Sequence, residues 1–266
     1  MKFPIALQLY TVRNEMAADF EGTLKKVKEM GYDGVEFAGL YGKTAAEVKA
    51  ICKEIGLVPI SAHVPFVDMI KNPDIMDVYK EIGCEYVVLP YLLEEYRPGN
   101  EKFQEIIDGS KILVKKAKEI GVKLCYHNHD FEYVKIGDEY AIDILFNDVP
   151  ELMPEFDVCW VNVTGESAVH YIHKYKGRQE ILHLKDYVGE QSASMYELIG
   201  IAQHGKEAEG TFEFRPVGKG VQNFPEILKA AEEVDMKWVV VEHDKPTMGL
   251  TPMESAKTSI DYLKSL

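Results

Sequence analysis

Four segments in the second half of the chain end in residues that could bind a metal ion. His127, Asp157, His183 and Glu242 each lie at or near the end of an apolar or β-branched run. Two carboxylates and two imidazoles could not stay unpaired in a cavity of low dielectric constant, because each buried charge would cost several kcal/mol. A divalent cation would satisfy them. Mixed ligands of this kind suit Mn²⁺, Zn²⁺, Co²⁺ or Fe²⁺ better than Ca²⁺.

The same four positions are consistent with strands whose alternate side chains point toward one interior. If the four ionisable residues point inward, the inward residues one layer below include Cys125, Ile181 and Val240, which are small or apolar as a core requires. A single histidine or aspartate at a strand end is more often structural. Four at matching depth favour a shared site.

The first half of the chain offers a second set of polar residues at strand ends: Gln8 and Tyr10 in the first, Glu36 in the second and His63 in the third. We expect them to bind hydroxyl groups of a small polar substrate, although each one alone could equally be structural. His129 is a further candidate for substrate binding or for metal orientation. Trp160 could stack on a sugar face, and core packing would explain it equally well.

These residues lie on a repeated unit of short strand, polar loop and amphipathic helix. The predicted strands are 5–10, 34–38, 58–63, 86–91, 123–127, 155–161, 181–185 and 238–242. The predicted helices are 19–30, 44–55, 103–120, 166–175, 223–234 and 251–263, several with an N-cap residue at the start and a glycine at the end.

Eight strand–helix units in about 250 residues predict an α/β fold, the (β/α)8 TIM barrel. A doubly wound open sheet is the alternative, but its usual glycine-rich turn is missing from "LYTVR" after the first strand. No linker divides the chain, so residues 1–266 are predicted to form one domain. The stretches 131–153 and 187–221 are predicted to be long loops, where barrel enzymes often carry function.

Composition excludes several classes of protein. The chain has 266 residues, 46% of them hydrophobic, and a formal net charge of −14. That charge argues against nucleic acid and membrane partners, and no apolar run is long enough to span a bilayer. Four widely spaced cysteines are predicted to be buried thiols. We expect a cytoplasmic protein with a small-molecule carbohydrate substrate; a homo-oligomer stays open.

The phrases "LQLYTVR", "GYDGVEF", "YHNHDFEY", "FDVCWV", "LHLKD", "VGKGVQNF" and "VVVEHD" occur in this order. Together they resemble the sugar phosphate isomerase/epimerase family of xylose isomerase-like barrels, which includes inosose dehydratases and hydroxypyruvate isomerases. The resemblance extends from Gln8 to the last helix.

The resemblance implies a divalent metal at the barrel mouth, with manganese expected first and cobalt, magnesium or zinc as alternatives. Asp157, His183 and Glu242 match the family's ligands from strands six to eight. Epimerase-type members have a glutamate at the end of strand five, where this chain has His127. In those members the two glutamates act on opposite faces of the substrate, so this difference bears directly on two-base epimerisation. His127, His129 or Glu132 could complete the metal shell.

The residues also suggest a reaction. A proton next to a carbonyl can be removed when a metal chelates that carbonyl and stabilises the enediolate. Glu242 is the candidate base, provided that burial raises its pKa, and His127 or His129 could substitute for the missing glutamate. Lys185 could stabilise an oxyanion or bind a phosphate, or could be a solvated surface residue.

We therefore predict a metal-dependent sugar or sugar phosphate isomerase/epimerase. A lyase acting on an inosose or keto-glycoside is the alternative, since one base suffices for elimination. A non-catalytic sugar-binding barrel is a further candidate. An endonuclease-IV-like nuclease is disfavoured by the net charge and by Trp160, which lies where those nucleases have a histidine.

Overall fold

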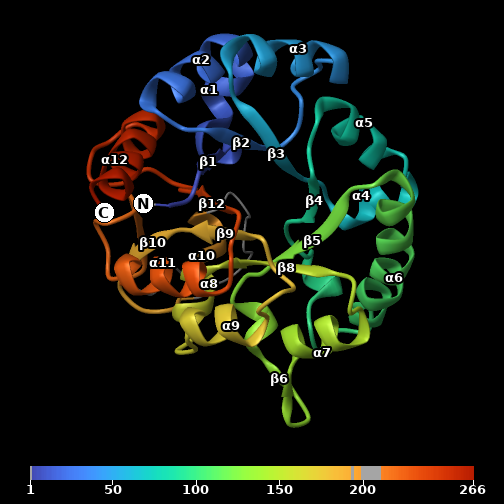
Figure 1. Ribbon diagram of the computed structural model, residues 1–266. Coiled ribbons are helices and arrows are strands. Elements are labelled where there is room, and N and C mark those ends of the chain that lie inside the picture. The colour runs from blue at the N-terminus through green and yellow to red at the C-terminus, as the bar shows by residue number, and fades with distance from the viewer. Residues whose placement is uncertain (1, 193–194, 199–210) are drawn as a thin grey trace.

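The computed structural model describes residues 2–192, 195–198 and 211–266. Eight parallel strands form a closed barrel in the order β1-β12-β9-β8-β5-β4-β3-β2, surrounded by helices (Figure 1). The predicted (β/α)8 barrel is confirmed, and the open doubly wound sheet is excluded. The barrel strands are β1 (Ile5–Gln8), β2 (Gly34–Phe37), β3 (Val58–His63), β4 (Tyr86–Leu89), β5 (Lys123–His127), β8 (Met153–Asp157), β9 (Ile181–Leu184) and β12 (Trp238–Val241).

Most barrel strands end slightly earlier than predicted, whereas β3 and β5 match their predicted ranges. The chain leaves the sheet at the barrel mouth, where the last predicted residues no longer have partners on a neighbouring strand. Lys185 and Glu242 therefore lie just after the ends of their strands, and Tyr10 lies in the short 3-10 helix Leu9–Val12 that follows β1. Side chains at these positions can reach the mouth of the barrel.

The predicted helices are present with nearly the expected ends. Asp19 and Thr44 cap two of them, and Thr44 forms a capping box with Glu47. None of the helices within the described residues has the length and apolarity that a bilayer span requires. The helices are α1 (Arg13–Ala18), α2 (Phe20–Met30), α3 (Ala45–Ile55), α4 (Phe66–Lys71), α5 (Ile75–Ile82), α6 (Phe103–Ile120), α7 (Ala141–Asp148), α8 (Val158–Asn162), α9 (Ala168–Lys174), α10 (Met195–Leu198), α11 (Phe224–Glu233) and α12 (Pro252–Ser265).

The two predicted long loops contain regular structure. The stretch 131–153 holds a short antiparallel hairpin of β6 (Lys135–Ile136) and β7 (Glu139–Tyr140), which projects from the barrel in Figure 1, and then α7. In the other stretch, β10 (Asp186–Val188) pairs with β11 (Glu213–Arg215). The sequence analysis missed these two strand pairs because strands of two or three residues are too short to show an alternating pattern. Residues 199–210 of that predicted loop lie outside the described residues.

Strand six was predicted to continue to residue 161, and that prediction is wrong. The strand β8 ends at Asp157, and α8 begins at once. Oδ1 of Asp157 accepts hydrogen bonds from the backbone N–H groups of Cys159 (2.8 Å) and Trp160 (3.2 Å). The aspartate thus caps the helix, which is favoured over continuing an apolar strand because it satisfies the first free amides.

The barrel interior below the mouth is apolar. Cys125, Ile181 and Val240 pack there with Tyr86 and other buried residues, which confirms the predicted inward direction of their strands. All four cysteines are buried free thiols, as predicted.

A network of charged and polar side chains around Glu180 lies at the opposite end of the barrel. Its carboxylate accepts hydrogen bonds from the Tyr86 hydroxyl (2.6 Å) and from Lys123, and Lys237 lies 3.0 Å away. Burial alone would raise the pKa of Glu180, but the Lys123 and Tyr86 hydrogen bonds lower it. A carboxylate with a lowered pKa stabilises the folded state above its unfolded pKa, and this contribution is lost as pH falls through the folded value.

Replacing Glu180 with Gln is therefore expected to lower the free energy of unfolding at pH 7 by about 1 kcal/mol, a modest value because solvent screens this network. The difference from wild type should shrink below about pH 4, where an unperturbed glutamate becomes protonated. Urea unfolding of both proteins at pH 7 and pH 3.5 measures this. A difference that is unchanged at pH 3.5 would contradict the assignment.

Candidate metal centre and its cavity

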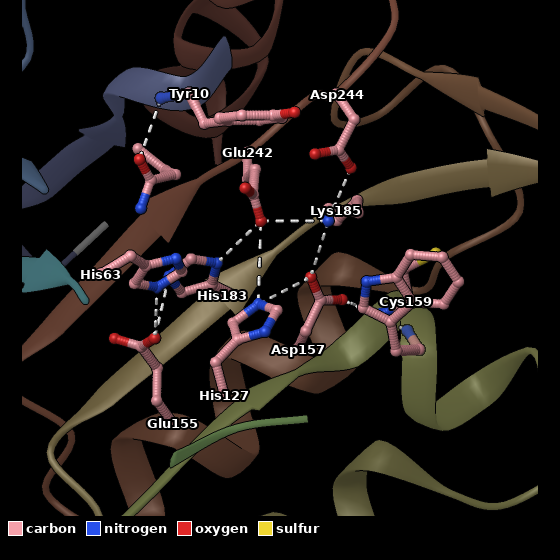
Figure 2. Close-up of polar contacts among 12 residues, drawn as sticks. Tyr10, His63, His127, Glu155, Asp157, Cys159, His183, Lys185, Glu242 and Asp244 are labelled. Carbon is pink, nitrogen blue, oxygen red and sulfur yellow. Dashed lines mark hydrogen bonds and ion pairs between the residues drawn. The ribbon is translucent and has the colours of Figure 1, made fainter. Parts of the chain in front are cut away.

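Four buried side chains converge at the mouth of the barrel, here called the mouth cluster: His127, Asp157, His183 and Glu242. One donor atom from each lies within 4.8 Å of the other three. Nε2 of His127 is 3.5 Å from Oδ2 of Asp157 and 3.7 Å from Oε2 of Glu242 (Figure 2). The structure therefore brings together the four residues that the sequence analysis placed at one site.

Local backbone structure fixes Asp157 within this cluster. Oδ1 is used by the α8 cap, so Oδ2 is left to face the cluster. The backbone N–H of Asp157 donates to Oδ1 of Asn128 (2.9 Å), which follows His127 on the neighbouring chain segment. The two ligand candidates on β5 and β8 are therefore positioned by a direct hydrogen bond between their own segments.

Lys185 is the cation beside the mouth cluster. Its Nζ lies 3.0 Å from Oε2 of Glu242, 3.3 Å from Oδ2 of Asp157 and 2.8 Å from Oδ2 of Asp244. The residue is 1% exposed, so the alternative of a solvated surface lysine is wrong. Burial alone would lower the pKa of Lys185, but the three carboxylates hold it well above its usual value. The lysine is therefore a fixed positive charge at the mouth.

A second group, here called the inner cluster, comprises Glu36, His63, Glu155 and His183. Nε2 of His63 lies 3.0 Å from both Glu36 and Glu155, and Nε2 of His183 lies 2.7 Å from Oε1 of Glu36. Gln8 and Ser61 complete the group, since Nε2 of Gln8 (2.7 Å) and Oγ of Ser61 (2.6 Å) donate to the Glu36 carboxylate.

His183 belongs to both clusters and joins them through its ring. Its Nδ1 lies 3.2 Å from Oε2 of Glu242 in the mouth cluster, while Nε2 faces Glu36 in the inner cluster. Burial alone would lower the pKa of His183, but Glu155 and Glu36 raise it well above its usual value. A hydrogen bond from Nε2–H to Glu36 orients the ring with Nδ1 toward the mouth, as carboxylates do for histidine ligands. Without a metal the ring is protonated at pH 7, so an ion that binds Nδ1 would displace its proton.

His127 carries the clearest sign that the mouth cluster fits a metal ion. Both ring nitrogens and Oδ2 of Asp157 are buried, and none of these atoms forms a hydrogen bond within the described residues. Nε2 and Oδ2 face each other at 3.5 Å, and Oδ2 also forms the ion pair with Lys185. Burial, the largest effect, lowers the pKa of His127 to about 4, so the imidazole is neutral at pH 7. A neutral imidazole is the form that binds metals. Buried nitrogen and oxygen donors that form no hydrogen bond, at this spacing, match a divalent transition metal.

The mouth cluster opens on a cavity of about 520 Å³. Of the residues predicted to bind substrate, Tyr10, His63 and His129 line this cavity, as do the predicted catalytic residues His127, Lys185 and Glu242. Gln8 and Glu36 do not line it. They are fully buried and bind each other, so they hold the inner cluster rather than a substrate hydroxyl.

Trp160 also lies off the cavity wall. Because strand six ends early, Trp160 is on α8, fully buried and stacked on Tyr196 and Phe212 with centroid distances of 6.0 and 6.3 Å. The prediction that its ring stacks on a sugar is not supported by this position, and core packing explains it. The indole also contacts His129, with the ring centroids 5.0 Å apart and the ring planes tilted by 36°.

The contacts of the three candidates for the strand-five ligand, His127, His129 and Glu132, favour His127. Glu132 accepts hydrogen bonds from the Tyr126 hydroxyl and from the backbone N–H of His129 (2.8 Å), so it anchors the loop beneath the cavity. His127 joins the mouth cluster and His129 does not. Glu155 was missed at the sequence level, although it lies two residues before Asp157 and the alternation along the strand points it inward.

A closed barrel with buried metal-type donors and a cavity at the carboxyl ends of its strands is the architecture of barrel enzymes. The model for the xylose isomerase-like TIM barrel matches residues 24–266. The chain belongs to this family.

Individual relatives are distant. The chain is 23% identical over 273 residues to an inosose dehydratase of Mesomycoplasma hyopneumoniae, covering 93% of this chain and 88% of the relative. Its fold is similar to that of a sugar phosphate isomerase/epimerase from Parabacteroides distasonis, with a TM-score of 0.76, 22% identity and 98% of both chains covered. The zinc-bound IOLI protein has a TM-score of 0.73 at 16% identity, with 99% of this chain and 97% of that protein covered.

Proposed function

We propose that this protein is a metal-dependent isomerase or epimerase of a keto-sugar, which acts by removing a proton next to the carbonyl group. The observation that carries the proposal is the buried mouth cluster directly beside the cavity, in which the ring nitrogens of His127 and Oδ2 of Asp157 form no hydrogen bond within the described residues. Relatives that act as sugar isomerases, epimerases and dehydratases support the same class of chemistry.

His127, Asp157, His183 and Glu242 would hold the ion, and manganese is the metal that we propose, with zinc, cobalt or magnesium as alternatives. When bound, a divalent cation acts as a Lewis acid that polarises the substrate carbonyl and makes the neighbouring C–H more acidic. The fixed orientation of His183 by Glu36 would keep its Nδ1 toward this position.

Glu242 is the proposed proton acceptor, since it lines the cavity at the mouth. Burial alone would raise its pKa, but Lys185 and His183 hold the pKa of Glu242 well below its usual range. The expected rise is therefore not found. The carboxylate is ionised at pH 7, which is the form that accepts a proton, and it depends on prior acidification of the substrate C–H. Lys185 is placed to donate a hydrogen bond to the oxygen on which negative charge develops.

The alternative, a lyase acting on an inosose or keto-glycoside, is favoured by one observation. Two-base epimerisation needs a second group, opposite Glu242, that donates a proton to the other face of the substrate. The strand-five position is His127, whose pKa of about 4 leaves its imidazole neutral at pH 7, so it is not an imidazolium acid. A single carboxylate base suffices for elimination. The similarity to inosose dehydratases agrees with this alternative.

The lining of the cavity favours a substrate without phosphate. Lys185 is the one lysine or arginine among its described lining residues, and it is already paired with three carboxylates. Asp68, Glu242 and Asp244 also line the cavity and would repel a phosphate group.

Removal of the metal is expected to abolish turnover. The purified protein would be treated with a chelator, dialysed and assayed with ketopentoses, ketohexoses and an inosose before and after Mn²⁺ is restored. Products of unchanged mass identify isomerisation or epimerisation, and loss of water identifies elimination. Turnover that survives complete metal removal would contradict the proposal, and metal-dependent binding without turnover would favour a sugar-binding barrel.

A further inference from the structure

The cavity at the barrel mouth has two chemically different halves. The polar half consists of residues from β5, from the loops that follow β9 and β12, and from the histidine that ends β3: His63, His127, His129, Lys185, Glu242 and Asp244. The other half is mainly apolar and comes from the loops after β3 and β4, from α4 and from α5: Val64, Pro65, Asp68, Ile75, Tyr79, Pro90 and Tyr91. It is called the apolar half below.

The aromatic ring of Tyr91, in the apolar half, is held in place by neighbouring side chains. The Tyr91 hydroxyl accepts a hydrogen bond from Arg97, whose guanidinium also lies over the Tyr91 ring at 5.2 Å. The same ring meets His129 edge-on at 5.0 Å, so it spans the boundary between the two halves. Ile75, Pro90 and Tyr91 are only partly buried, and the surface they leave open faces the cavity.

The size of the cavity exceeds what the polar half alone would need. Its volume of about 520 Å³ lies in the range, roughly 300–1,000 Å³, of pockets that enclose drug-sized ligands. A sugar ring held beside Glu242 and Lys185 would leave the apolar half in contact with water. Covering that apolar surface with an apolar ligand group is favourable, because it removes the surface from water.

We propose that the substrate is a glycoside whose sugar ring carries a ketone, with this ring in the polar half and an apolar, ring-bearing aglycone in the apolar half. The assignment of the sugar end rests on the proposed function; the aglycone is inferred from the cavity wall itself. Asp68 is the one charged residue among the described residues of the apolar half, and as an anion it disfavours an acidic aglycone. A neutral aromatic group fits this wall best, since Tyr79 and Tyr91 offer rings for stacking or edge contacts.

The test is a comparison of binding by two probes, p-nitrophenyl β-D-glucoside and methyl β-D-glucoside, measured by titration calorimetry with the full-length, metal-loaded protein. The aryl glucoside is expected to bind at least about tenfold more tightly than the methyl glucoside. Replacing Ile75 with Asn should remove most of this preference and leave the methyl glucoside unaffected. Ile112→Asn, the same change at an exposed position of α6, is the matched control.

A second variant keeps the proposal testable if Ile75→Asn does not fold. Ala38 lines the cavity, so Ala38→Leu should narrow it and weaken aryl glucoside binding, whereas Ala38→Ser should not. Equal affinities for the two glucosides, no binding of either, or an aryl preference that survives both Ile75→Asn and Ala38→Leu would overturn the proposal. These binding results do not depend on turnover, so a failure of the proposed reaction would be seen separately in the metal-dependence assay.

Discussion

Replacing Glu242 with Gln is expected to reduce turnover by about 10³-fold or more. The amide keeps the size of the side chain but removes the proton acceptor, and a positioned base contributes about 10²- to 10⁴-fold. It also removes the negative charge that faces Lys185 and His183, so metal content should fall as well. Steady-state assays and metal analysis of the purified variant measure the two effects.

The matched control for this prediction is Glu151→Gln, the same change at an exposed position. It should leave both turnover and metal content unchanged. Lys185 retains Asp157 and Asp244 as partners in Glu242→Gln, so the variant is expected to fold. Activity close to that of wild type would remove Glu242 from the mechanism, whatever the metal content.

Replacing Glu36 with Gln should destabilise the protein by about 3–5 kcal/mol, because it removes one partner of a buried charged network. Glu36 is fully buried and accepts hydrogen bonds from Gln8 and Ser61 while it faces the rings of His63 and His183. The new amide N–H group would have to face the Gln8 amide or the Ser61 hydroxyl, which are themselves hydrogen-bond donors. Urea unfolding measures the loss of stability.

The same variant should bind metal more weakly, by about 10- to 100-fold, since the partner that orients a histidine ligand contributes this much to metal affinity. Glu81→Gln, at an exposed position, is the control. A loss of stability with metal affinity intact would show that Glu36 serves the fold alone. If neither quantity changed, the inner cluster would have no role in orienting His183.

The barrel itself was accessible from the sequence because each of its strands is a short apolar run next to a helix with clear end signals. The capping box at Thr44 and the glycine after Ile120 are examples. The end of strand six could not be predicted from the sequence. The apolar residues from Val158 to Val161 fit a strand, and only the hydrogen bonds to the Asp157 carboxylate show that a helix starts there.

The mouth cluster was predicted because its residues end consecutive strands, and strand ends of a parallel barrel meet. The inner cluster was only half predicted. Glu36 and His63 were assigned to substrate, since their sequence positions do not reveal that His183 turns one ring nitrogen toward Glu36. Distances between strands that are far apart in the chain determine these partners, and no local pattern encodes them.

The double use of the Asp157 carboxylate has a consequence for how this region can change. Because one oxygen is tied to the amides two and three residues later, adding or deleting a residue between 157 and 160 would rotate the other oxygen away from His127 and Lys185. Among the described residues, none forms such a hydrogen bond with the exposed tip of the β6–β7 hairpin, Gly137 and Asp138, so the hairpin can vary in length. Insertions among related barrels should therefore accumulate at the hairpin and be absent from this junction.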